Sequence, residues 1–144
     1  MIWRSLPLIL MVLTACSSEV EQQVSTKDTN DAVSVPIVAV ISCRVNGMPI
    51  GVSACFIGSV ESASGSLKVE SGGIVKQYTN YELAGKNGST LEFRLKEPFD
   101  ITAQASSESG YVLRMEVRAG SRIIFQDETT EFGLIDADST LLEI

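Results

Sequence analysis

Residues 91–96 read Leu-Glu-Phe-Arg-Leu-Lys, in which three large apolar side chains alternate with three charged ones. Successive side chains of a β-strand point to opposite faces of its sheet, whereas an amphipathic helix repeats its apolar residues every three or four positions. This stretch therefore predicts a strand that buries Leu91, Phe93 and Leu95 and leaves its other face in water.

The same alternation continues on both sides of this strand. It is clearest in residues 99–105 and 113–118, where Phe99, Ile101, Leu113 and Met115 fall on apolar positions. Weaker patterns predict further strands at residues 37–45, 51–58, 67–69, 74–79 and 122–126, and the end of the chain has two shorter, less regular candidates at residues 132–135 and 141–144. Gly and Asn-Gly turn signals separate most of them.

No window after residue 16 has a convincing helical period, and seven to nine short strands at this spacing are typical of an all-β sandwich. We expect a small antiparallel β-sandwich, with a small β-barrel as the alternative that the pattern leaves open. The length suits one domain, which we place at residues 36–144.

The N-terminus has the composition of a signal peptide. Arg4 precedes an apolar run over residues 6–13, which is about half the length that a membrane-spanning helix needs. The run ends in Leu13-Thr14-Ala15-Cys16, which resembles the lipobox of bacterial lipoproteins. The resemblance implies that residues 1–15 are removed and that Cys16 becomes a lipidated N-terminus.

Several acyl chains on one residue hold a protein at a membrane far more firmly than a single chain does. Ser17 follows the cysteine, where lipoproteins retained in the inner membrane carry aspartate. The resemblance therefore implies an outer-membrane location, which we expect to face the periplasm. Residues 16–35 are polar and acidic, and we expect them to form a flexible linker.

The formal charge of the chain is −7, and loss of residues 1–15, with Arg4 as their one charged residue, makes it −8. A nucleic-acid partner is not expected, because phosphate recognition requires a basic patch. With Cys16 assigned to lipid, the two other cysteines, Cys43 and Cys55, remain as a disulfide pair in an exported protein. The alternative is two buried thiols.

We expect residues 37–45 and 51–58 to form a hairpin that the disulfide ties across its loop. Asn46-Gly47 is a tight-turn signal, but Pro49 cannot donate to a β-ladder. A longer loop over residues 46–50 is therefore predicted.

The chain contains no histidine, which excludes Ser-His and Cys-His nucleophiles and most catalytic zinc sites. Walker, G-x-G-x-x-G, G-x-S-x-G and S-x-x-K motifs are also absent from the sequence. We expect no enzymatic activity, no catalytic residues, no metal and no cofactor.

Two sets of residues are candidates for binding. Tyr78 and Tyr81, with Lys76 nearby, would form a ligand-binding face unless they merely cap the edge of the core. The second set is six acids in residues 127–144, which contain no base: Asp127, Glu128, Glu131, Asp136, Asp138 and Glu143. These acids would steer a basic partner unless they only keep a terminal strand in solution.

The function expected from these features is noncovalent. We expect a lipid-anchored envelope protein that acts as a binding or accessory module for another envelope component, with a protein partner. The alternatives are a carbohydrate or small-ligand module and an inhibitor, immunity or exclusion lipoprotein. A deep pocket at the tyrosines would favour a ligand, and a flat or edge-strand surface would favour a protein.

Overall fold

A computed structural model of the chain describes residues 34–58 and 64–144. In this part there are nine strands, two short α-helices and one 3₁₀ helix. The predicted signal peptide, the lipidation residue Cys16 and most of the predicted linker lie outside the described residues. The elements are β1 (Ile37–Val45), β2 (Met48–Ile50), α1 (Ala54–Ile57), β3 (Ser66–Ser71), β4 (Ile74–Tyr78), α2 (Asn80–Ala84), β5 (Thr90–Leu95), β6 (Phe99–Gln104), β7 (Tyr111–Ala119), β8 (Arg122–Thr129), β9 (Leu134–Asp138) and η2 (Ser139–Leu141).

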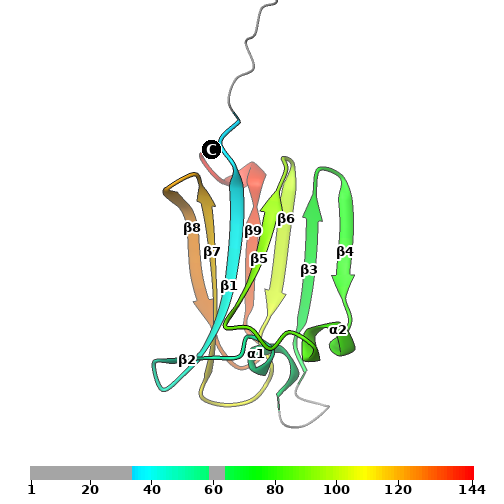
Figure 1. Ribbon diagram of the computed structural model, residues 1–144, viewed down its shortest axis with the longest axis vertical. Coiled ribbons are helices and arrows are strands. Elements are labelled where there is room, and N and C mark those ends of the chain that lie inside the picture. The colour runs from blue at the N-terminus through cyan, green and yellow to red at the C-terminus, as the bar shows by residue number, and fades with distance from the viewer. Residues whose placement is uncertain (1–33, 59–63) are drawn as a thin grey trace, which may run out of the picture. The chain divides into compact units, whose positions relative to one another are not determined.

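The strands form two antiparallel sheets that face each other (Figure 1). In the first sheet β1 pairs with β7 on one side and with β2 and β5 on the other, and β8 pairs with β7. The second sheet has the order β4-β3-β6-β9. Of the two architectures that the sequence left open, the sandwich is therefore the one that forms.

The core lies between the sheets and follows the predicted alternation. Every second residue of β1, from Ile37 to Cys43, is buried, and the registers with β5 and β7 place buried side chains opposite one another. Burying a large apolar side chain such as Ile41 contributes about 1.5–3 kcal/mol. The largest fully buried side chains are Phe56, Phe99, Ile41, Leu67, Leu83, Ile101, Leu113, Met115, Ile135, Val52, Val117 and Cys43.

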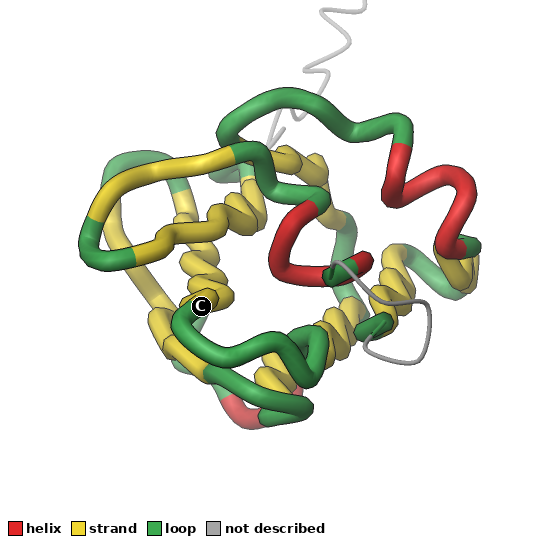
Figure 2. The backbone as a smooth tube through the Cα atoms, turned by 90° about the horizontal axis from the view of Figure 1, so that it is seen from below, coloured by secondary structure: helices red, strands yellow, loops and turns green. Residues whose placement is uncertain are grey.

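The lower end of the sandwich in Figure 1 is covered by α1, which Figure 2 shows from below between the strands. Residues 51–58 were predicted to be a strand, and this prediction is wrong. Val52, Cys55 and Phe56 are buried at a spacing of three and four residues, which is the spacing of one helical face. The predicted disulfide is present, with a Cα–Cα distance of 5.7 Å, and it ties β1 to this helix instead of joining two strands.

The loop predicted over residues 46–50 is a tight two-residue turn. Asn46 and Gly47 have φ values of 51° and 78°, as a type I′ turn requires, and β2 begins at Met48. Pro49 stands opposite Arg44, one pair beyond the pair that closes the turn. In such a pair the backbone N–H groups point away from the partner strand, so the missing donor of the proline removes no ladder bond.

The second helix, α2, was also not predicted. Thr79 and Glu82 form a capping box: the Thr79 Oγ1 accepts from the Glu82 backbone N–H at 3.2 Å, and Glu82 Oε2 accepts from the Thr79 N–H at 2.9 Å. The strand expected at residues 141–144 does not form: η2 ends at Leu141, and residues 142–144 belong to no helix or strand. At the N-terminus of η2, Asp138 accepts from the Thr140 N–H at 2.8 Å. Neither helix of the described part, nor η2, is long and apolar enough to cross a bilayer.

Candidate functional site

Strand β4 forms one edge of the second sheet and pairs, within the described residues, only with β3. Ser71 and Ile74 close a two-residue turn at Gly72-Gly73, whose φ values of 57° and 80° again fit a type I′ turn. Because ladder bonds alternate from the closing pair, the backbone groups of Val75 and Gln77 point to the outer edge. The side chains of Ile74 and Val75 are 76% and 56% exposed.

Tyr78, at the lower end of β4, faces the core side of its sheet. Its ring meets that of Phe93 edge to face, with the centroids 5.7 Å apart, so the strand end is anchored against β5. Lys76 lies on the same face of β4, with its Nζ 4.4 Å from the centroid of the Tyr78 ring. The lysine and the tyrosine thus form a cation–π pair at the sheet edge.

The capping box places Tyr81 and Glu82 beside this pair. Tyr81 is 90% exposed, and Glu82 Oε1 lies 3.2 Å from Lys76 Nζ. The pKa of Glu82 is below its usual value because the Thr79 backbone N–H and then Lys76 donate hydrogen bonds to the carboxylate. Lys76, Tyr78, Tyr81 and Glu82, together with Lys86, line an open cavity of about 490 Å³, which we call the tyrosine cavity.

The tyrosine cavity thus brings together the two tyrosines and the lysine that the sequence singled out. It offers an aromatic face, two amines and a carboxylate that is already engaged by Thr79 and Lys76. This set suits stacking and hydrogen bonding to a partner. In residues 34–58 and 64–144 no group of three or more His, Cys, Asp or Glu side chains could hold a metal ion.

The six acids near the C-terminus do not gather on one surface. Glu128 lies on the outer face of the first sheet, where it pairs with Arg44 and, at 3.3 Å, with Arg114. Asp136 and Asp138 lie on β9, in the second sheet. The remaining three, Asp127, Glu131 and Glu143, lie on β8, in the β8–β9 turn and after η2, respectively.

The two acids on β9 face a third carboxylate on the neighbouring strand. Asp138 is the cross-strand partner of Asp100, and Thr102 is that of Asp136. Partial burial and then the nearby carboxylates of Asp100 and Asp138 raise the pKa of Asp136. Lys68 Nζ lies 3.4 Å from the Asp100 carboxylate and relieves part of this repulsion.

A chain of ion pairs covers the outer face of the first sheet, and the sequence analysis did not identify it. Glu116 is only 7% exposed and lies between Arg114, at 3.2 Å, and Arg118, while Arg114 continues to Glu128. Burial raises the pKa of Glu116, but hydrogen bonds from Arg118 and Arg114 outweigh it, so the pKa is lowered overall. These charges satisfy one another, which favours a structural role.

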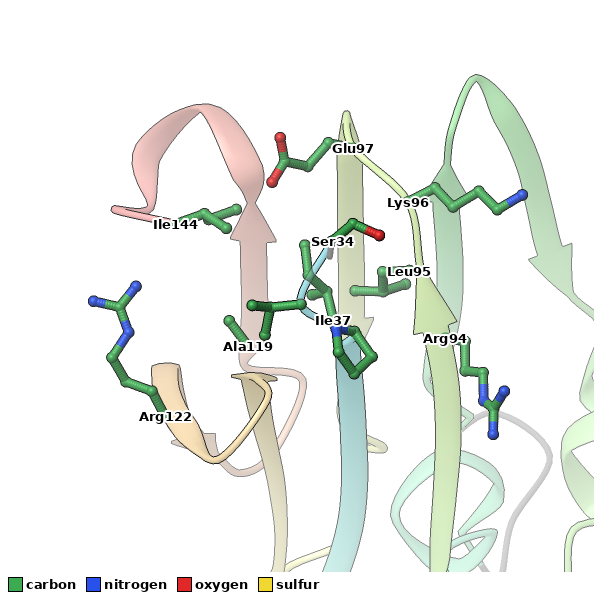
Figure 3. A pocket seen from close by; sticks show the side chains of 11 residues that line it. Ser34, Ile37, Arg94, Leu95, Lys96, Glu97, Ala119, Arg122 and Ile144 are labelled. Atoms are coloured by element: carbon green, nitrogen blue, oxygen red, sulfur yellow. The ribbon is translucent and has the colours of Figure 1, made fainter. Parts of the chain in front are cut away.

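A larger cavity, of about 760 Å³, opens at the upper end of the sandwich (Figure 3). We call it the upper cavity. Ile37, Leu95 and Ala119 form its apolar base, and Ile144 points into it from the side. Its basic residues are Arg94, Lys96 and Arg122, and Glu97 is its only acid. No local pattern in the sequence indicates this cavity, because its residues come from four separate stretches of the chain.

Comparison of the chain with protein-family models, with curated proteins and with solved structures found no match.

Proposed function

We propose that this protein is a lipid-anchored binding module of the bacterial cell envelope, which holds a protein partner along the outer edge of β4. The lipobox-like Leu13 to Cys16 supports the anchor, and Ser17 after the cysteine supports the outer-membrane location. The free edge of β4 is the observation that supports the binding role.

Natural proteins protect the edges of their sheets with charges, prolines, bulges or covering segments. Among the described residues no proline, bulge or covering segment protects the outer edge of β4, and its one charged side chain, Lys76, is engaged by Glu82 and by the Tyr78 ring. Two exposed β-branched side chains, Ile74 and Val75, lie along the edge. A partner strand added here would gain backbone hydrogen bonds from Val75 and Gln77. The edge is thus suited to strand addition.

The tyrosine cavity lies at the end of the same edge and would supply the specificity. A strand that runs along β4 reaches the cavity beside Tyr78 and Tyr81, where a side chain of the partner can be accommodated. In strand addition the backbone contributes affinity and the side-chain pockets select the sequence. The exposed aromatic ring of Tyr81 is of the residue type that dominates binding at interfaces.

Photocross-linking in intact envelopes tests this proposal. A benzophenone amino acid at Val75 or at Tyr81 should each yield the same discrete adduct, whereas one at Met48, which is 64% exposed on β2, should yield none. No adduct from Val75 and Tyr81, or equal adducts from all three positions, would refute the proposed edge.

A proline substitution can block strand addition at the edge of β4 while leaving the rest of the fold unchanged. Gln77→Pro removes an outward-pointing donor without removing a bond to β3, so the strand should persist while the Val75 adduct disappears. Gln77→Ala, which keeps the donor, is the matched control and should retain the adduct. An adduct of undiminished yield in a folded Gln77→Pro protein would contradict strand addition.

The volume of the tyrosine cavity favours a second candidate function, which is binding of a carbohydrate or another small ligand. Cavities of about 300–1,000 Å³ with a few polar groups are typical of ligand sites. In that case Tyr81→Ala would abolish binding of a glycan while Gln77→Pro would leave it intact. Strand addition predicts that both substitutions abolish partner binding.

A further inference from the structure

We propose that the upper end of the sandwich lies against the surface of a phospholipid bilayer, with its apolar side chains in the interface and its cations among anionic headgroups. This orientation goes beyond the proposed partner binding and rests on the proposed lipid anchor at Cys16.

The exposed apolar side chains support this orientation. Ten large hydrophobic side chains of the described residues are exposed, and half of them lie at the upper end: Val35, Ile74, Ile123, Leu141 and Ile144. They come from the start of β1, the β3–β4 turn, the start of β8 and the segment after β9, which Figure 1 shows at one end. Leu141 is the most exposed of these, at 81%.

The upper cavity lies among these side chains and adds an apolar recess to the surface. Arg94 and Lys96 stand on one side of it and Arg122 on the other (Figure 3). Among the residues that line the cavity these three cations outnumber the one acid, Glu97, in a chain whose overall charge is −7. Asp138, at the N-terminus of η2, and Glu143 are acids of the same end that lie outside the lining. Each Lys or Arg near an anionic membrane contributes attraction, which salt screens.

The point at which the anchor segment enters the domain indicates that the upper end faces the bilayer. The segment that leads to Cys16 joins the domain at Ser34, which itself lines the upper cavity. Residues 17–33 can span no more than about 60 Å, so an acylated Cys16 would hold the domain within that distance of the membrane, and the attached end could approach the surface most closely. At the resulting high effective concentration even a weak surface contact is populated.

Tryptophan substitutions can show which end faces the bilayer. The only tryptophan is Trp3, in the segment expected to be removed, so one introduced indole would report one position. Processed Leu141→Trp protein is reconstituted in vesicles of phosphatidylethanolamine and phosphatidylglycerol that carry a nitroxide quencher in the acyl chains. Its fluorescence should be quenched, whereas that of Met48→Trp, at the opposite end, should not.

A second pair of variants controls for the case in which one tryptophan substitution disturbs the fold locally. Ile74→Trp should behave as Leu141→Trp does, and Tyr81→Trp as Met48→Trp does. If all variants float with the vesicles but are quenched equally or not at all, the orientation is refuted while the anchor stands. If none floats and none is quenched, both proposals fail. Concentration-dependent emission changes of Leu141→Trp without lipid would assign this end to a second copy of the chain and overturn the proposal.

Charge substitutions test the lipid chemistry. Lys96→Gln and Arg122→Gln should each lower the ratio of docked to undocked protein about fivefold in low salt. Lys86→Gln, at the tyrosine cavity, removes the same charge away from the upper end and should have no effect. If none of the three substitutions changes the quenching of the Leu141→Trp fluorescence, the assignment to anionic lipid is overturned.

Discussion

Loss of the disulfide should destabilise the domain by an amount that follows from the length of the loop it closes. Cys43 and Cys55 are 12 residues apart, and in the chain-entropy model closing such a loop stabilises the folded state by about 3 kcal/mol at 25 °C. Both residues are fully buried, so Cys43→Ala with Cys55→Ala also removes packed sulfur atoms from the core. The double variant should therefore lose at least the loop-closure contribution.

Urea unfolding measures this loss. With a denaturant dependence of about 1.5 kcal/mol/M, 3 kcal/mol lowers the midpoint by about 2 M. Wild-type protein cycled through the unfolded state in reductant keeps its sulfur atoms, so it isolates loop closure from the packing loss. The urea midpoint of the double variant should be the same with and without reductant.

The position of the bond gives a second readout. Because it ties β1 to α1, its loss should raise amide exchange at the lower end, where the Ser106 N–H donates to the Cys55 carbonyl at 2.6 Å. Coincident wild-type midpoints with and without reductant would refute the reasoning, since the bond would then constrain nothing in the unfolded chain.

Three further predictions concern the anchor and two of the three carboxylates whose pKa is shifted, Asp136 and Glu116. Labelled fatty acid should enter the wild-type protein and not Cys16→Ser; an unlabelled wild type would contradict the proposed anchor. Asp136→Asn should raise the free energy of unfolding at pH 7 by a few tenths of a kcal/mol, because the raised pKa of Asp136 means that its ionised carboxylate is disfavoured in the folded state. This gain should vanish as the pH falls through that pKa. The exposed control is Glu131→Gln. Glu116→Gln should lower the free energy of unfolding by about 1–2 kcal/mol at pH 7. The difference between variant and wild type should shrink in acid, because the wild type loses the contribution of the ionised Glu116 as the pH falls through its lowered pKa. A difference that is constant with pH would show that Glu116 acts through packing alone.

The sequence predicted the strands well where a strand lies over the core along its whole length. Leu91, Phe93 and Leu95 keep their alternation because β5 lies over the core along its length. The alternation of apolar residues predicted the wrong element where a single helical turn covers an end of the sandwich. The helix α1 has four residues, too few for a helical period to exceed the β-branched and apolar content that indicated a strand.

The candidate site was predicted in part. Lys76, Tyr78 and Tyr81 are near in sequence, and the turn into α2 keeps them near in space around one cavity. That β4 is an edge strand has no local signal, because the order of strands in a sheet depends on pairings between distant segments. The acids near the C-terminus separate for the same reason: the chain crosses from one sheet to the other between Glu128 and Asp136.

The central place of β1 has a mechanical consequence. Force transmitted along the chain from Ser34 enters the domain at the start of β1, which is paired with β7 along its whole length and with β5 and β2 on its other side. A pull along this strand loads many backbone hydrogen bonds at once in shear, whereas a pull across the strand would break them one after another. Beyond Cys43 the disulfide stops the strand from being drawn out past α1. A domain suspended between a membrane and a partner would thus resist tension along its strongest direction.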